Sequence, residues 1–405
     1  MRKRYLHGSV QRTQARLGTN GLLLALLVIG TCFAYFRWQK FGASLADVPL
    51  LIAIVMAITS STNLQHREAW VGKLKPILIA IYVYIVVALL PLLSGGGFIW
   101  VQLAKDLFSF AIFPVTFLTI ARVVDEQRIN RVLRIAITLS VLIVCFTVLS
   151  GTGSRSSGLL GSPNLAGNWA AAFVMLLLLI EVPENRGLRI GLVSVLVVAS
   201  FRMASLGGIL CILTSLAFWL PRRSKNLTVG KQVLPFLIGI GAPTILQAFD
   251  TFTGLNRYGR SSQGRLSIWG EALKVWFEKP LGLGIGNFAD PNLGLTVAPE
   301  AHNDYISSLV ELGILGPIAI GGICLAISMA GGLRTRTMVV FYLVSAISHN
   351  SINFRHIWVC MAICFAYDVL PQLQKPGAET ASPEIQKAER RKNRSDVELF
   401  KPSRT

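Results

Sequence analysis

The sequence predicts an all-α, polytopic integral membrane protein, and three observations support this class. Of its 405 residues, 53% are hydrophobic and only 15% are charged, whereas a soluble globular domain has about 25% charged residues. The mean hydropathy is +0.57. The apolar residues fall in long runs, and a helix needs roughly 20 such residues to cross a bilayer. These runs include 21–36, 76–93, 165–180 and 306–330.

The runs predict about twelve transmembrane helices. Their centres lie near residues 28, 53, 85, 110, 141, 173, 194, 212, 240, 318, 345 and 363. Most connections are short, and no soluble domain of useful size interrupts the runs. We therefore expect one transmembrane domain over residues 1–374.

The chain is strongly basic, with 39 Lys and Arg against 20 Asp and Glu and a net charge of +19. These cations lie between the apolar runs, and most of them fall on the face that carries the amino terminus. The positive-inside rule then places both termini in the cytoplasm. The basic excess is interpreted as a topology signal, so no nucleic-acid partner is expected.

Neither a cleaved leader nor a metal site is predicted. The first apolar run follows a basic head and is not closed by a small-residue cleavage site. All six cysteines lie inside predicted spans, where buried thiols act as small hydrophobes. Cys360 and Cys364 have no His or carboxylate cluster beside them, so we expect no metal and no cofactor.

Two segments depart from the pattern of short connections. Residues 375–405 are basic and poor in apolar residues, which predicts a disordered cytoplasmic tail near anionic lipid. Residues 251–303 form a long connection that the topology places in the periplasm. Connections of this length are usually functional or disordered.

The periplasmic loop is expected to carry an amphipathic helix. Between residues 263 and 279, helical spacing separates an apolar set from a charged set, the apolar set being Leu266, Trp269, Leu273, Trp276 and Phe277. Trp269 and Trp276 suit the headgroup layer. Pro280 is expected to end the helix, and a flexible turn to follow at Gly282, Gly284 and Gly286. Because no strand precedes these glycines, a nucleotide site is not predicted.

Two arginines on the periplasmic side are candidates for holding an anion. Arg202 lies between two apolar spans with almost no polar loop, and it either snorkels to the headgroups or binds a phosphate. Arg265 lies in the first turn of the amphipathic helix, where the helix dipole favours anions. Arg265 could instead pair with Glu271 or Asp250.

His302 is the candidate general base. It precedes Asn303 and Asp304, which are good helix caps, and so lies at the mouth of the next span. An imidazole can accept a proton near neutral pH. A histidine at a helix start is often structural, but its position on the same side as several arginines favours a catalytic role.

Further residues are expected to line the same periplasmic cavity. They are Arg155, Asn164, Asn303, His349, Arg355 and Lys105. His349 and Arg355 could alternatively serve as local caps. Lys105 could form a neutralising pair with Asp106, the usual fate of charges inside a membrane, or help to hold an anionic donor.

Several stretches together resemble the O-antigen ligase and polymerase superfamily of bacterial envelope glycosyltransferases. One is the ordered array Arg265, Trp269, Pro280 to Phe288, His302, Asn303, Glu311, Gly313 and Gly316. Residues 161–167 resemble the family's Gly-Asn-Pro-Asn motif, and residues 200–202 its Ser-Arg motif. Ser162 stands where the family usually has Asn, and Met203 and Ala204 stand where Gly is common, which puts the close packing of both stretches in question.

The resemblance implies transfer of a glycan from an undecaprenyl-diphosphate carrier at the periplasmic face of the inner membrane, with inversion and without a metal. His302 matches the family histidine that activates the acceptor hydroxyl. Arg265 and Arg202 match the arginines that hold the donor diphosphate. The three side chains are therefore expected to border one outward-opening cavity.

Three acceptors fit the resemblance: lipid A core for a ligase, a second carrier-linked glycan for a polymerase, and a protein hydroxyl. The last is disfavoured because such enzymes usually carry a large extra periplasmic domain. A transporter of lipid-linked sugars is a further alternative, but we find no convincing repeat and only Asp106 and Asp368 as intramembrane carboxylates.

Overall fold

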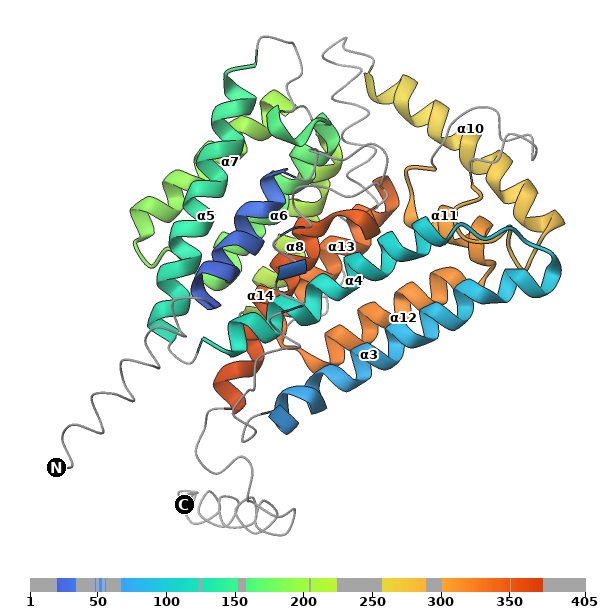
Figure 1. The fold of residues 1–405 in the computed structure, drawn as a ribbon. Helices are drawn as coiled ribbons and strands as arrows, with labels where there is room; N and C mark the ends of the chain where they lie inside the picture. Colours follow the sequence, from blue (N-terminus) through green and yellow to red (C-terminus); the bar gives the residue numbers. More distant parts are fainter. Residues whose placement is uncertain are drawn as a thin grey trace, which may run out of the picture.

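The computed structural model describes residues 20–33, 48, 51–52, 55, 67–123, 126–151, 158–203, 205–223, 257–288, 301–349 and 351–373. These residues form helices and no strand, which confirms the all-α class (Figure 1). In chain order the elements are η1 (Thr31–Phe33), α3 (Arg67–Leu89), η3 (Leu90–Ser94), α4 (Trp100–Ala121), α5 (Glu126–Leu149), η4 (Gly158–Leu160), α6 (Pro163–Ile180), α7 (Arg186–Met203), α8 (Leu206–Arg223), α10 (Arg257–Glu278), α11 (Asp304–Leu312), α12 (Leu315–Ala330), α13 (Leu333–Ser348), η6 (Ser351–Asn353) and α14 (Arg355–Leu373).

Five described helical segments are long and apolar enough to cross a membrane, namely Glu68–Ser94, Trp100–Ala121, Gln127–Leu149, Pro163–Ile180 and Arg355–Leu373. Shorter apolar helices cover Asn20–Phe33, Gly207–Leu220 and Leu315–Ala330. Described helices lie at every expected span centre except 53 and 240, which fall outside the described residues. The count of about twelve spans, the periplasmic loop and the tail therefore stay predictions.

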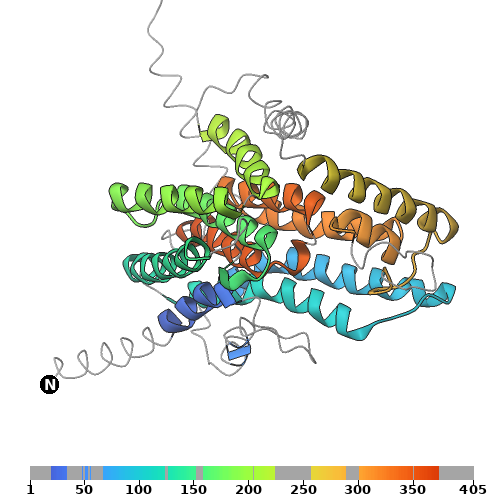
Figure 2. The ribbon, with the colours of Figure 1, turned by 90° about the horizontal axis from the view of Figure 1, so that it is seen from above.

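Helix α14 lies at the centre of the bundle. Figure 2 shows α3, α4 and α12 on one side of it and the green helices α5 to α8 on the other. Every residue of α14 from Arg355 to Ala366 is buried. A helix that is buried on all sides must be apolar around most of its circumference, which explains its long apolar run.

Aromatic side chains join α14 to α4. The ring of Phe365 lies edge-on to Phe113 and Phe117, with centroids 5.2 and 5.0 Å apart. Phe110 and Trp358 make a similar contact at 5.3 Å. Edge-to-face pairs each add about 0.5–1.5 kcal/mol beyond the burial of their area, so this seam holds the two helices in a defined register.

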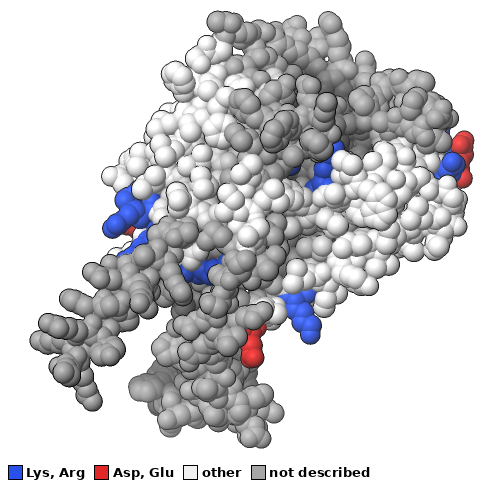
Figure 3. Space-filling view, in the orientation of Figure 1, with Lys and Arg blue, Asp and Glu red and all other residues white. Residues whose placement is uncertain are grey.

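Cationic side chains gather at one end of the bundle. Figure 3 shows blue side chains along the lower left of the molecule. Lysines and arginines lie within the first three turns of four helices: Lys73 and Lys75 of α3, Arg128, Arg131 and Arg134 of α5, Arg186 and Arg189 of α7, and Arg334 and Arg336 of α13. We call this the basic end; it is the end that the positive-inside rule assigns to the cytoplasm.

Candidate functional site

His302 is the exposed member of an otherwise buried segment, residues 301–304, which we call the histidine strap. Ala301, Asn303 and Asp304 are at most 5% exposed. The backbone of His302 is left-handed, with φ of 50°, which is uncommon for a residue other than glycine and persists only where neighbours hold it. The strap therefore presents the imidazole at a surface instead of packing it in an apolar interface.

Contacts on both sides fix the strap. Trp269 of α10 donates its indole N–H to the carbonyl of Ala301 at 2.9 Å. Asn303 caps α11, because its Oδ1 accepts from the amides of Tyr305 and Ile306 at 2.9 and 3.1 Å. The expected capping role of Asn303 is confirmed. These hydrogen bonds hold both neighbours of His302, the carbonyl of Ala301 before it and the capping residue Asn303 after it.

The carboxylate of Asp304 ties the strap to η6. Its Oδ2 accepts from the backbone amides of Ser351 and Ile352 at 2.8 and 3.0 Å. Burial raises the pKa of Asp304 well above its usual range, although these two amides act in the opposite direction. Asp304 thus links His302 to the connection between α13 and α14, a link that no local sequence pattern indicates.

The glycine turn, residues 280–288, packs closely against the end of α11. The amides of Leu283 and Gly284 donate to the carbonyls of Val310 and Glu311, both at 2.8 Å. A Cβ on Gly284, where φ is +94°, would lie 1.6 Å from the carbonyl oxygen of Gly97. The expectation of a flexible turn is therefore wrong, because these glycines allow backbones to approach and bond.

Helix α10 is confirmed, and it ends at Glu278, just before Pro280. It begins at Arg257, however, so the expected place of Arg265 in the first turn is wrong: Arg265 lies in the third turn, where the helix amino terminus no longer favours an anion. Its apolar face meets protein. Ile268, Trp269, Ala272, Val275 and Trp276 pack with residues of the strap, α11 and the glycine turn, namely Leu283, Phe288, Ala301, Ile306 and Val310. Both tryptophan indoles are partly buried against this cluster, and their place in the headgroup layer stays a prediction.

A buried polar network extends from η6 to α6. The Nε2 of His356 lies 2.9 Å from Oδ1 of Asn168, and Nδ2 of Asn168 donates to Ser345 at 2.6 Å. Ser345 in turn bonds Ser351, whose amide donates to Asp304. Since Asn168 lies one helical turn after Asn164, the network brings the α6 motif close to the strap.

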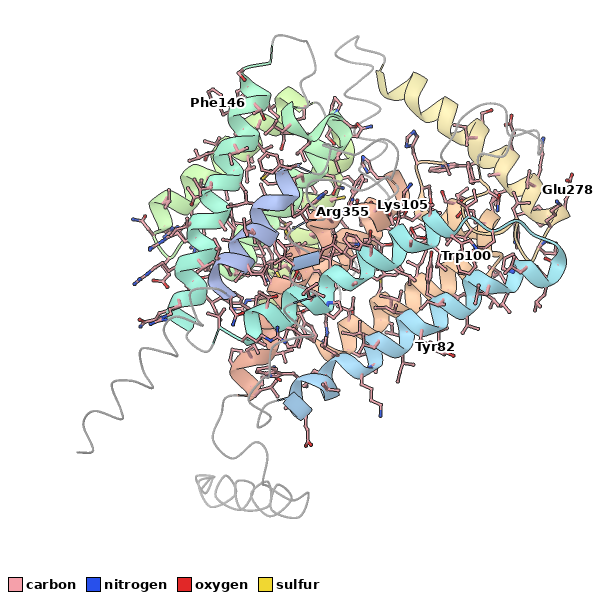
Figure 4. The ribbon with its side chains drawn as sticks, in the orientation of Figure 1. Tyr82, Trp100, Lys105, Phe146, Glu278 and Arg355 are labelled. Carbon is pink, nitrogen blue, oxygen red and sulfur yellow. The ribbon has the colours of Figure 1, made fainter. Side chains whose placement is uncertain are left out.

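Lys105 and Arg355 lie where α4 meets the start of α14 (Figure 4). The guanidinium carbon of Arg355 lies 6.0 Å from the centroid of the Phe108 ring, within the range of a cation–π contact. The hydroxyl of Ser109, one turn after Lys105, donates to Asn353 at 3.4 Å. Two of the expected cavity residues therefore lie near η6.

Asp106, one of the two alternative partners expected for Lys105, is bonded by neutral groups. Asp106 is 4% exposed, and its carboxylate accepts from Tyr84 at 2.7 Å and Gln102 at 3.0 Å. No ion pair joins Lys105 to Asp106, although both residues are described. Neutral donors supply the hydrogen bonds of the aspartate, and the charge of the half-buried Lys105 acts on it only through space.

The other expected residues are placed less fully. Arg202 lies in α7 and Arg265 in α10, one turn before Trp269, but the side chains of both fall outside the described part of the chain, as does all of Arg155. Asn164 is half-buried in the first turn of α6. His349 follows α13, is 6% exposed and has its ring 5.7 Å from that of Phe354.

The motif stretch at the start of α6, residues 161–167, adjoins the residues that directly follow the motif stretch at the end of α7, residues 200–202. A Cβ on Gly167 would lie 1.9 Å from Cβ of Ser205, and one on Gly208 would lie 2.6 Å from the Gly167 carbonyl oxygen. Met203 is fully buried. Close packing of these stretches is therefore kept although Met203 stands where glycine is common in the resembled family.

No group of three or more His, Cys, Asp or Glu side chains within the described ranges has the geometry of a metal site. The six thiols are buried and unpaired by disulfides. Sequence reasoning missed Asp304 as a tie to η6, Asn168 as part of the network and Trp269 as the anchor of Ala301. Only the α10 spacing of Trp269 gave any signal, because the other contacts join residues far apart in the chain.

Residues 190–321 match the family described as O-antigen ligase. The matched region runs from α7 into α12 and contains Arg202, Arg265, the glycine turn and the histidine strap. No curated protein matches the chain.

Proposed function

Because the chain is a member of the O-antigen ligase and polymerase superfamily through residues 190–321, we propose that it transfers a glycan from undecaprenyl diphosphate to lipid A core oligosaccharide. The reaction takes place at the periplasmic face of the bacterial inner membrane, with both chain termini in the cytoplasm. Residues 1–374 form the transferase domain, and residues 375–405 form a basic tail. The exposed His302, held within a buried strap in the matched region, carries the proposal.

His302 acts as the general base. The acceptor hydroxyl oxygen attacks the anomeric carbon of the donor sugar, and the proton of that hydroxyl passes to the imidazole. The bond from the anomeric carbon to the diphosphate oxygen breaks, and the electron pair leaves with the diphosphate. Attack opposite the leaving group inverts the anomeric centre. A positioned base of this kind contributes about 10²–10⁴-fold.

Guanidinium groups stabilise the departing diphosphate. Arg265 and Arg202 bind its oxygens, since the planar fork of arginine matches phosphate geometry and is always charged. Permanent charges of this kind can stabilise a leaving group without a metal. Lys105 supports them, in line with its lack of an ion pair to Asp106, and Arg155, Asn164, Asn303, His349 and Arg355 line the same space.

A transfer assay with two acceptors tests the proposal. The full chain in nanodiscs receives an undecaprenyl-diphosphate glycan together with either lipid A core or a second carrier-linked glycan. We expect product on lipid A core, lost in His302→Asn and Arg265→Gln. His66→Asn, at a histidine that the topology places on the cytoplasmic side, is the matched control and should keep wild-type activity.

Extension of the carrier-linked glycan instead would make the chain a polymerase of the same superfamily, which the family match accommodates equally. The base, the arginines and the leaving group keep their roles in that case. Transfer to neither acceptor by the wild type would contradict the proposal and favour transport of a lipid-linked sugar.

A further inference from the structure

A cavity of about 230 Å³ lies at the basic end, at the start of α5. Figure 1 shows that this end of α5 is far from α11, which follows the strap. Six residues from the start of α5 and the connection between α6 and α7 line it: Gln127, Asn130, Arg131, Arg134, Val182 and Glu184. The cavity is smaller than the roughly 300–1,000 Å³ of sites for drug-sized ligands. Its size and polar lining suit a phosphate group with a small substituent.

Arg131 and Arg134 supply the positive charge of this cavity. They are three residues apart on α5, so they share a helix face, and both are exposed. Within the described ranges, the ion pair found is that of Arg334 with Asp368, and no carboxylate pairs with Arg131 or Arg134. Two forked donors that face the same space are well suited to phosphate oxygens.

Glu184 is the negative group in the lining, and it already has a partner. Its Oε1 accepts from Nδ2 of Asn130 at 3.2 Å, while Oδ1 of Asn130 accepts from the hydroxyl of Tyr367. The carboxylate and the amide are therefore bonded to protein groups. Two guanidinium charges against one carboxylate leave the cavity cationic.

An apolar stripe continues from Arg131 along the same face of α5. Ile135, Leu139, Leu142 and Phe146 follow at spacings of four, four, three and four residues, and they are 52%, 43%, 53% and 73% exposed. Phe146 lies at the far end of α5 (Figure 4). The helix rises by about 22 Å over the 15 residue steps from Arg131 to Phe146, which exceeds the half-thickness of about 15 Å of a bilayer core.

We propose that the start of α5 binds the phosphate headgroup of one anionic phospholipid, whose acyl chain lies along the apolar stripe. A basic pocket at the cytoplasmic boundary with an apolar face directly beyond it fits the two chemical parts of such a lipid. A free phosphate would use the arginines but not the stripe. This site is remote from His302 and does not rest on the proposed glycosyl transfer.

Native mass spectrometry of the full chain in detergent tests the site. Dioleoyl phosphatidylglycerol is compared with dioleoyl phosphatidylcholine, with inorganic phosphate as competitor. We expect one phosphatidylglycerol to be retained in preference to phosphatidylcholine. R131Q/R134Q should reduce this retention by about tenfold or more, given the roughly 1 kcal/mol that each surface cation contributes to anionic lipid binding.

Two further variants complete the test. K73Q/K75Q removes the same charge at the same end but outside the cavity, and should retain the lipid as the wild type does. L139S/L142S should weaken retention while leaving both arginines in place. Equal retention by R131Q/R134Q and wild type would overturn the proposal, as would equal binding of both lipids. Displacement of the lipid by inorganic phosphate would identify a free-anion site instead.

Discussion

The two ends of the bundle handle their polar groups differently. At the strap, Asn303, Asp304 and the Ala301 carbonyl are all bonded to protein groups, and one side chain, His302, is exposed among them. At the basic end, Arg131 and Arg134 are exposed and have no carboxylate partner among the described residues. At the strap, several hydrogen bonds fix the backbone that orients one side chain. At the basic end, the arginines need only to lie at the depth of the membrane boundary, without a fixed orientation.

The largest effect is expected where backbones meet at the glycine turn. Gly284→Ala would place a methyl group 1.6 Å from the Gly97 carbonyl oxygen at a φ of +94°, so the turn must separate from its neighbours. We expect a loss of at least about 3 kcal/mol of stability, seen as a lower Tm in detergent together with lost transfer.

Gly270→Ala is the matched control for this prediction. Gly270 lies within α10, and a Cβ there would meet nothing within 4 Å. Alanine is favoured over glycine in a helix by about 1 kcal/mol, so this variant should be as stable as the wild type or more so. Equal Tm values for the two alanine variants would mean that the turn does not depend on close backbone contact.

A smaller loss is expected when the strap is released from η6. Asp304→Ala leaves the buried amides of Ser351 and Ile352 without an acceptor, and each such group costs about 1–3 kcal/mol. Asp304→Asn keeps one side-chain oxygen that can accept a hydrogen bond, so its loss of stability should be about half that of Asp304→Ala. Both stability and the transfer rate are measured, because the tie positions His302. A full transfer rate in Asp304→Ala would show that the strap holds without it.

The smallest effect separates the two tryptophans of α10. Trp269→Phe removes the bond to Ala301 and should lower stability by about 1 kcal/mol. The indole N–H of Trp276 is buried and has no partner in the described part of the chain, so Trp276→Phe should be neutral or slightly stabilising. Differential scanning calorimetry of the two variants measures the difference in stability. Equal losses of stability in both would contradict the anchoring role of Trp269.

The sequence predicted features that depend on local periodicity or on one residue type at one place. Apolar run length located the described helices, the spacing in residues 263–279 predicted α10, and Asn303 was identified as a cap. The tie from Asp304 to η6 and the bond of Asn168 to His356 could not be predicted. Each joins groups separated by 47 or more residues, and local pattern carries no information on such pairings.

The expected flexibility of the glycine turn was wrong for a related reason. Alternating glycines form the same sequence pattern whether they make a loop flexible or allow two backbones to approach closely. Only the positions of Gly97 and of the Glu311 carbonyl in the fold show that close approach is the case here. The sequence likewise left open whether Lys105 pairs with its chain neighbour, because it could not show that Tyr84 of α3 and Gln102 bond the Asp106 carboxylate.

The most direct test of the account is the single-turnover rate of glycan transfer by His302→Asn. Asparagine tolerates a left-handed backbone, so the strap should keep its conformation and the Tm its wild-type value. The account predicts a rate lower by about 10²–10⁴-fold with donor binding unchanged. A wild-type rate in this variant would contradict it, since His302 would then not take the proton from the acceptor.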